Sequence, residues 1–464
     1  MPLYVGIDCS TQGLTLQVLS VGVDDDAAHL AAPGDHIVFQ HVVNFDRDLP
    51  LFGTRHGALP YDNPAVVHAP PQMWADALEL GLAALAQSGL DLDDIAAISG
   101  SAQQHGTVYL DAAGEFSRPT SPIWLDTSTS VECAEITSAL GGPNAVAQLT
   151  GSRAFERFSG PQIRKFWKQD PVAYARTARI HLISSFLASR LIGRDAPVDV
   201  CDASGMSLMH LGTSDWDQGA LDATAPGLRD RLPPIVPSST VVGTLAPTWR
   251  ERFGLPAAKV VAWLGDNSSS LVGVGLEREG DVAISLGTSD TIFGVMSQPR
   301  VSPDGIGHVF ASPGGGFMGI TVFANGSLAR ETVRDMYGLD WQGFSEALRS
   351  TPPGNNGARM LPYFVPEITP PIPVAGVQRF NLDEHDVARN VRAVVEAQMT
   401  AMKRYSAWMG VKITRLVATG GASGNPDVLK VMSEVFGVPV ERRDVRNSAC
   451  LGAALRAAQG RVSG

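Results

Sequence analysis

Two stretches of this sequence share one pattern. Residues 5–20 read VGIDCSTQGLTLQVLS, and residues 282–297 read VAISLGTSDTIFGVMS. Each is an apolar run, a turn of small residues around a threonine, and a second apolar run; they align without a gap when Thr11 lies opposite Thr288. The pattern predicts two β-hairpins. Unless the match is a chance one, it also predicts two similar domains, each beginning with a hairpin.

The rest of the chain alternates strand-like and helix-like segments. Strand patterns cover residues 96–99, 108–110, 259–264 and 416–419, and helical spacing covers residues 73–86, 387–408, 425–436 and 449–458. Such alternation predicts an α/β fold. A proline-rich stretch at residues 233–245 predicts the domain boundary, giving domains 1–240 and 241–464. Residues 351–377 are also proline-rich and are predicted to form a long surface loop.

Composition excludes several classes of function. The 464 residues are 18% charged and 44% hydrophobic, with a net charge of −11 and no basic run, which disfavours nucleic-acid binding. None of the lysines follows a glycine, so a Walker-type phosphate loop is excluded. Four widely spaced cysteines make a disulfide framework or a structural zinc site improbable. The N-terminus lacks the pattern of a signal peptide and no apolar run is long enough for a membrane span, so we expect a cytoplasmic protein.

The two hairpin turns are candidate phosphate sites. Small residues in the turn that follows Asp8 and in the turn from Gly287 to Asp290 can direct backbone N–H groups at phosphate oxygens. Asp8 stands at a strand end, where its carboxylate could hold a Mg²⁺ ion. Each turn taken alone is equally compatible with an ordinary hairpin.

Three further segments follow predicted strands and carry polar groups. Asp266 lies at the carboxyl end of one strand and is either a catalytic base or a helix N-cap. Gln104 and His105 lie in a polar turn whose donors and acceptors suit a polyol, although a lone histidine is more often structural. Gly420 and Gly421 let the backbone approach a flat ligand closely, unless this segment is a plain βα turn capped by Asn425.

Taken in order, these segments resemble the FGGY-type carbohydrate kinases, and most of all the xylulose kinases of the animal type. The resemblance runs from the turn after Asp8 through residues 45–50, 99–106, 150–158, 204–206, 265–267, 285–291 and 418–423 to residues 447–450. It implies two actin-like domains of the ribonuclease H type around a central cleft. It also implies transfer of the γ-phosphoryl group of ATP to a sugar hydroxyl with Mg²⁺.

The resemblance assigns roles to individual residues. Asp266 resembles the catalytic base, and the ketose-binding set is Gln104, His105, Arg157, Asp266 and Asn267. The ATP-binding set is Asp8, Ser10, Thr11 and Gln12 in the first turn, Gly287 and Thr288 in the second, and Trp341, Gly420, Gly421, Ala422 and Asn425 around the adenosine; Asp8 is the expected metal ligand.

The expected reaction is phosphorylation of D-xylulose to D-xylulose 5-phosphate, in a protein that forms a homodimer or stays monomeric. Kinases for ribulose or glycerol, and a non-catalytic ATP or sugar sensor on the same fold, are the alternatives. One position departs from the family, which commonly has Lys or Arg where this chain has Thr15. The departure removes a positive charge near the phosphates.

Overall fold

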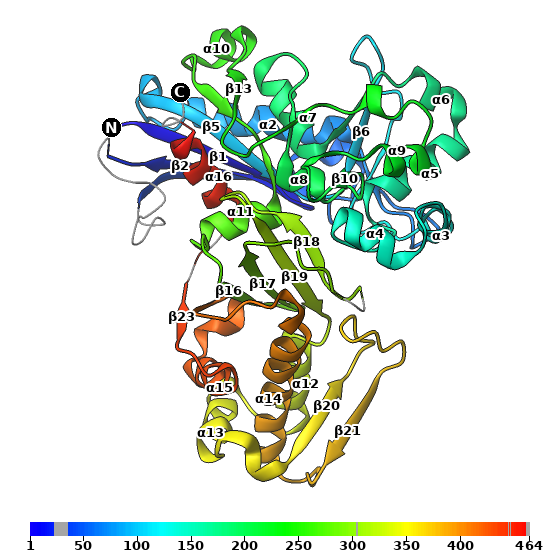
Figure 1. Cartoon of the computed structure of the whole chain (residues 1–464). Helices are drawn as coiled ribbons and strands as arrows, with labels where there is room; N and C mark the ends of the chain where they lie inside the picture. The colour runs from blue at the N-terminus through cyan, green and yellow to red at the C-terminus, as the bar shows by residue number, and fades with distance from the viewer. Residues whose placement is uncertain (23–35, 303–304, 444, 446, 461–464) are drawn as a thin grey trace. The chain divides into compact units, whose positions relative to one another are not determined.

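The computed structural model describes residues 1–22, 36–302, 305–443, 445 and 447–460 (Figure 1). The chain divides into two compact units. Unit 1 comprises residues 1–275, 310–315 and 447–464, and unit 2 comprises residues 276–309 and 316–446. Each unit is built on its own sheet and is described separately. No helix in the described ranges is long and apolar enough to cross a membrane.

The sheet of unit 1 is formed around the first predicted hairpin. Its order is β13 (Val241–Thr244), β14 (Lys259–Val261), β5 (Ile95–Ala102), β1 (Leu3–Cys9), β2 (Gly13–Ser20) and β3 (Ile37–Asn44), and β15 (Leu264–Gly265) also pairs with β5. Strands β1 and β2 are antiparallel, whereas β1, β14 and β15 run parallel to β5. The carboxyl ends of β1, β5 and β15 therefore meet at one edge, where α/β sheets bind ligands.

Helices pack against this sheet because apolar residues alternate along its strands. Helices α2 (Pro71–Ala86) and α7 (Ile183–Ile192) contribute to the main apolar core, which contains Trp74, Ile7 and Leu14. The late helix α16 (Ser448–Gln459) contacts β1, β2 and β5. A Cβ on Gly6 of β1 would lie 2.3 Å from the carbonyl oxygen of Cys450, so only glycine lets α16 pack this closely.

The remaining helices and strands of unit 1 surround this core. The helices are α1 (Phe45–Asp48), α3 (Ser130–Ala139), α4 (Pro143–Thr150), α5 (Ser159–Gln169), α6 (Pro171–Arg176), α8 (Val200–Ser204), α9 (Gln218–Thr224), α10 (Pro247–Phe253) and α11 (Asp266–Gly273). The short strands are β4 (His68–Ala69), β6 (Thr107–Leu110), β7 (Ser121–Pro122), β8 (Arg179–Leu182), β9 (Val198–Asp199), β10 (Met209–His210), β11 (Asp215–Trp216) and β12 (Ile235–Val236).

The sheet of unit 2 repeats the arrangement of the first. Its order is β18 (His308–Ala311), β19 (Phe317–Phe323), β17 (Asp290–Met296), β16 (Asp281–Leu286), β22 (Arg415–Thr419) and β23 (Val440–Arg442). In both sheets an antiparallel hairpin continues into a parallel strand, β5 beside β1 and β22 beside β16. The prediction of an α/β protein with two similar hairpin-led halves is confirmed.

Helices and one hairpin complete unit 2. The helices are α12 (Ser327–Met336), α13 (Trp341–Ser350), α14 (Val387–Tyr405) and α15 (Pro426–Phe436). Strands β20 (Arg359–Tyr363) and β21 (Gly376–Phe380) form an antiparallel pair beside α14 (Figure 1). Residues 351–377 are therefore not the long irregular loop that their prolines suggested, because β20 lies inside this segment.

The units divide elsewhere than the boundary expected near residue 240. Residues 241–275 belong to unit 1 because β13, β14 and β15 complete its sheet. Residues 447–460 return to unit 1 after all of unit 2, since α16 covers β1 and β5. As a result Asp266, expected in the C-terminal half, shares a unit with Asp8, His105 and Arg157.

Candidate active site

A half-buried carboxyl stands at the edge where the parallel strands end. Asp8 lies opposite Ser101 in the β1–β5 register, and the Ser101 hydroxyl donates a hydrogen bond of 2.6 Å to Asp8 Oδ1. Burial raises the pKa of Asp8 to about 6 despite this hydrogen bond. A carboxyl that resists ionisation here would be stabilised in its charged form by a cation.

Asp266 is the second carboxyl of this edge. It is the first residue of α11, and Gly265 occupies the N-cap position, so the N-cap interpretation of Asp266 is wrong. Burial, and next the negative charge of Asp8, raise the pKa of Asp266 to about 7. The backbone N–H of Asn267 donates to Asp266 Oδ1 at 2.8 Å and fixes the carboxyl. A fixed carboxyl with a pKa near neutrality suits a general base.

The polar turn after β5 reaches the same place. The Asn267 side-chain amide donates to Gln104 Oε1 at 2.9 Å. His105 is held at a φ of 73°, a conformation that is costly for a residue with a Cβ. Its Nδ1 donates to the carbonyl oxygen of Gly205 at 2.8 Å, and its ring packs 4.4 Å from that of Phe158. Strain and fixed orientation together are typical of a functional residue rather than of a filler of the core.

Arg157 is next to Phe158 in the chain and is partly buried. Burial lowers its pKa, although the nearby carboxylate of Glu156 opposes that effect. The structure thus brings Gln104, His105 and Asn267 together, and it places Arg157 beside the aromatic that packs on His105.

The sequence patterns did not predict Asp202 of α8 as a site residue. A Cβ on Gly265 would lie 2.6 Å from the side chain of Gln104 and 2.8 Å from Asp202 Oδ1, so the two side chains meet over this glycine. Ser184 donates a short hydrogen bond to Asp202 Oδ2. Burial, followed by the charges of Asp199 and Asp266, raises the pKa of Asp202 well above its usual range. The available signal was the segment Ser204–Met206, which begins two residues after Asp202.

Part of the hydrogen-bonding capacity of the first turn is used within the turn itself. The N–H and hydroxyl of Ser10 both donate to the carbonyl oxygen of Gly13, at 2.9 and 3.0 Å. The indole of Trp124 donates to Thr11 Oγ1 at 2.8 Å, and Gln12 is exposed. Thr11 is therefore oriented from outside the turn, and the hydroxyl of Ser10 has a structural partner.

A buried polar network underlies Trp124. Asp126 accepts hydrogen bonds from the Val67 N–H at 2.9 Å and from Gln162 at 2.8 Å. Its carboxylate lies 3.4 Å from the ring of His68. Although burial opposes ionisation, these donors hold the pKa of Asp126 far below its ordinary value. Asp126 is therefore a structural anchor of this network.

The second turn, in unit 2, presents its residues to solvent. Thr288 and Ser289 are exposed between β16 and β17, and the carbonyl oxygen of Gly287 accepts from the Ser327 N–H at 2.8 Å. At the base of the turn the fully buried Asp290 accepts two hydrogen bonds from Arg330, at 2.8 and 3.0 Å. This ion pair holds the turn against the start of α12.

In the glycine pair after β22, Gly420 is required by its own backbone conformation and by the close approach of Leu286. Gly420 has a φ of 83°, and a Cβ there would lie 2.6 Å from the carbonyl oxygen of Leu286. Gly421 begins a short 3₁₀ turn that contains Ala422. Asn425 caps α15 by accepting from the Asp427 and Val428 N–H groups, and its amide donates to Ser345 of α13 at 2.8 Å. The cap interpretation of Asn425 is thus confirmed, and its expected role towards adenosine remains a prediction.

Trp341 begins α13 in the same unit. Its side chain is 41% exposed, and the guanidinium of Arg334 lies 4.6 Å from its ring centroid. A half-exposed aromatic on a helix tied to Asn425 is available for stacking on a flat ligand. For the metal, no group of three or more His, Cys, Asp or Glu side chains gathers within the described ranges. Asp8 with Asp266 nearby supplies hard oxygen donors that fit Mg²⁺ already bound to phosphates.

Comparison with known proteins decides the family. The N-terminal domain of the FGGY family of carbohydrate kinases matches residues 56–273, and its C-terminal domain matches residues 282–460. The chain belongs to the FGGY family of carbohydrate kinases. It is therefore a sugar kinase, and membership implies ATP as the phosphoryl donor.

FGGY relatives cover nearly the whole chain. The xylulose kinase of Rattus norvegicus is 41% identical over 99% of this chain and 88% of its own length. Xylulose kinase 2 of Arabidopsis thaliana is 38% identical over 99% of this chain and 87% of its own length. The crystal structure of a xylulose kinase from Brucella ovis superposes with a TM-score of 0.84 at 24% identity, covering 100% of this chain and 91% of that one. The predicted two-domain FGGY kinase fold is confirmed.

Proposed function

We propose that this FGGY kinase transfers the γ-phosphoryl group of ATP to D-xylulose and forms D-xylulose 5-phosphate and ADP. The observation that carries the proposal is Asp266, a fixed carboxyl with a pKa of about 7 beside Gln104 and Asn267. Relatives at 38–41% identity that bear the name xylulose kinase support the choice of sugar.

The proposed mechanism consists of one proton transfer to Asp266 and one transfer of the γ-phosphoryl group. Asp266 in its ionised form accepts the proton of the terminal hydroxyl of the ketose. The oxygen of that hydroxyl forms a bond to the γ-phosphorus, and the bond from this phosphorus to the β–γ bridging oxygen breaks, which releases ADP. Gln104, His105, Arg157 and Asn267 orient the ketose so that only this hydroxyl reaches the base.

The phosphates are assigned to the two hairpin turns. Thr11 and Gln12 in unit 1, and Thr288 in unit 2, can offer backbone N–H groups to them. Ser10, bonded to Gly13, and Gly287, bonded to Ser327, are assigned to shaping the two turns. Mg²⁺, held by Asp8 when bound, supplies positive charge that the lysine-poor sequence does not. Trp341, Gly420, Gly421, Ala422 and Asn425 are assigned to the adenosine.

An ATP-coupled assay with D-xylulose, D-ribulose, L-ribulose and glycerol tests the substrate. We expect the highest kcat/KM with D-xylulose and no turnover when EDTA replaces Mg²⁺. A higher kcat/KM with glycerol or a ribulose would overturn the choice of sugar. Failure to turn over any of the four would favour a non-catalytic sensor.

The variant Asp266→Asn tests the base. We expect kcat to fall by about 10²-fold or more, while the dissociation constant for D-xylulose, measured by calorimetry, changes little. Asp62→Asn, at an exposed position outside the site, is the charge-matched control. Near-normal turnover in Asp266→Asn would remove this residue from its role.

A further inference from the structure

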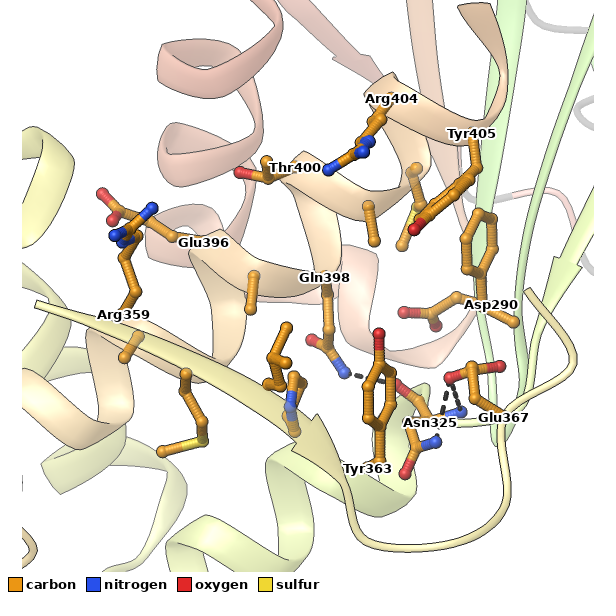
Figure 2. Close-up of a pocket in the computed structure, with 18 of the residues that line it drawn as sticks. Asp290, Asn325, Arg359, Tyr363, Glu367, Glu396, Gln398, Thr400, Arg404 and Tyr405 are labelled. Carbon is orange, nitrogen blue, oxygen red and sulfur yellow. Dashed lines mark hydrogen bonds between the residues drawn. The ribbon is translucent and has the colours of Figure 1, made fainter. Parts of the chain in front are cut away.

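Unit 2 contains a cavity that the proposed reaction does not use. Its volume is about 590 Å³, within the range of small-molecule sites, and it lies between α14 and the strand β20 (Figure 2). Its walls are largely apolar, with contributions from Phe323, Met360, Pro362, Phe380, Ala397 and Met402. None of the residues assigned to ATP, such as Thr288, Trp341 or Gly420, lines it.

The acidic groups nearest the deep wall already have partners. Asp290 is neutralised by Arg330, as described above. Glu367 Oε1 accepts from the Ala324 N–H at 2.6 Å, and its Oε2 accepts from the Asn325 side chain at 2.9 Å. Figure 2 shows this bonded group of Asn325 and Glu367 at one side of the cavity. These acids have no unmet demand for a cationic ligand.

At the opposite end, Glu396 accepts from Arg392 Nε at 2.7 Å and from the Gly354 N–H at 2.8 Å. The exposed guanidinium of Arg359 is drawn near Glu396 in Figure 2. The charge of Glu396 at this end is therefore balanced by Arg392.

Three hydroxyls and one guanidinium at the cavity can each donate a hydrogen bond to a ligand. Thr369 is 1% exposed, and its hydroxyl lines the cavity without a partner among the described residues. In the same described part of the chain, the hydroxyls of Tyr363 and Tyr405 and the guanidinium of Arg404 form no side-chain hydrogen bond or ion pair. Both tyrosine hydroxyls point towards the middle of the cavity in Figure 2, and Arg404 lies beside Tyr405 at the end of α14.

A buried polar group without a partner is costly, so an unpaired buried hydroxyl indicates a place for a ligand. Thr369 is the buried group of this set; the Tyr363 and Tyr405 side chains are half-buried, and the exposed Arg404 guanidinium lies 5.5 Å from the Tyr405 ring centroid. These hydroxyls and the guanidinium, beside an apolar wall, would bind an anionic head group and an apolar body. We propose that this cavity is a second ligand site of the protein, for a small amphipathic anion such as an aromatic carboxylate or phosphate monoester. Arg404 and the hydroxyls of Tyr363, Tyr405 and Thr369 hold the anionic group, and the side of α14 around Ala397 holds the apolar body.

Calorimetry and saturation-transfer NMR on the full chain test the site, with phenyl phosphate and benzoate as probes. Phenol and benzylamine are the neutral and cationic controls. We expect the two anions to bind and benzylamine not to bind. Saturating ADP should leave phenyl phosphate bound, because the site is separate from the residues assigned to the nucleotide. This readout does not depend on turnover, so it can succeed where the proposed reaction fails.

Variants locate the binding. Arg404→Gln should weaken phenyl phosphate binding about tenfold or more, and Ala397→Trp should abolish it by filling the cavity. Lys430→Gln, an exposed cation of the same unit outside the cavity, should leave binding unchanged. If a thermal melt shows that Ala397→Trp is not folded, Arg404→Gln and Tyr363→Phe test the site instead, and both should weaken phenyl phosphate binding. No binding of either anion, displacement by ADP, equal binding of benzylamine, or binding unchanged in Arg404→Gln would overturn the proposal.

Discussion

At the scale of single residues, Asp266 shows how catalysis and stability oppose each other. Its half-buried carboxyl is partly shielded from water and lies near the negative charge of Asp8, and both effects favour the neutral form. Because a base must be ionised to accept a proton, the residue works from the form that the fold disfavours. Because the pKa of Asp266 is about 7, the carboxyl changes between its neutral and ionised forms within the physiological pH range.

Activity should therefore rise with pH. As pH increases through about 7, Asp266 loses its proton and becomes competent as a base, so kcat/KM for the ketose should increase and then level off. Below that pKa it should fall about tenfold per pH unit, and more steeply below about pH 6, where Asp8 is protonated too. A pH profile of kcat/KM checks this; a flat profile from about pH 5.5 to about pH 8.5 would contradict it.

Stability should show the opposite trend. A carboxyl whose pKa is raised on folding stabilises the folded state at low pH, and this contribution is lost as pH rises from about 4 through about 7. Asp266→Asn removes the ionisable group, so at pH 8 the ligand-free variant should be more stable than the natural protein by roughly 1–4 kcal/mol. Thermal melts should show this gap closing towards pH 4. A variant that is less stable at pH 8 would indicate a structural role for the carboxylate.

Thr15 is a second residue-scale test, since it lies directly opposite Asp8 in the hairpin. Thr15→Lys would place an ammonium group beside the phosphates and two carboxyls of raised pKa. We expect KM for ATP to fall several-fold and the pH midpoint of kcat/KM to move lower. Thr15→Met, of similar length and without charge, is the control. An equal effect of both substitutions on KM would show that charge is not the cause.

At the scale of helices and strands, the sequence predicted most of what the structure contains. The apolar runs at residues 3–9 and 416–419 are β1 and β22, and the helical spacing at residues 73–86 and 387–408 corresponds to α2 and α14. These predictions succeeded because each element has an apolar face whose period differs between strand and helix. The run at residues 259–264 is divided into β14 and β15, which periodicity alone did not indicate.

The candidate site was less accessible to sequence reasoning. Asp266 and His105 follow strands and could be located by that position. Asp202 belongs to the site only because its side chain meets that of Gln104 over Gly265. This contact joins distant parts of the chain, so no local sequence pattern predicts it. The cavity beside α14 likewise combines residues from five separate segments, and no spacing in the sequence reveals it.

One helix crossing should be sensitive to a single methyl group. Helices α11 and α16 approach so closely that a Cβ on Gly273 would lie 2.0 Å from the carbonyl oxygen of Ser448. Gly273→Ala should therefore lower stability by about 2 kcal/mol or more and reduce turnover, because α11 carries Asp266 at its start. Gly376→Ala, where a Cβ would meet no atom within 4 Å, is the control. Equal melting temperatures for the two variants would contradict the argument.

At the scale of the whole chain, the two units differ in continuity. Unit 2 lies between residues 276 and 446 apart from the short segment 310–315, whereas unit 1 needs residues from both ends of the sequence. The apolar core of unit 2 includes Ile284, Phe344 and Val394. A protein of residues 276–446 should therefore unfold cooperatively, with near-native helix content by circular dichroism.

The matching fragment of residues 1–275 should behave differently. It lacks α16, so the face of β1 that carries Gly6 and the side of α11 that carries Gly273 would lose their cover. We expect this fragment to aggregate or bind a hydrophobic dye, and a synthetic peptide of residues 447–464 to reduce both effects. A well-folded fragment of residues 1–275 would contradict the importance given to α16.

The late position of α16 also bears on the order in which a ribosome delivers this protein. Strands β1, β2 and β5 are synthesised before unit 2. The face of their sheet that α16 covers stays exposed while unit 2 is synthesised. Since domains generally fold as they emerge, unit 2 can be complete before the unit that contains Asp8 and Asp266 closes. The nascent chain thus carries an exposed apolar surface until α16 has been synthesised, and unit 1 can close only after that point.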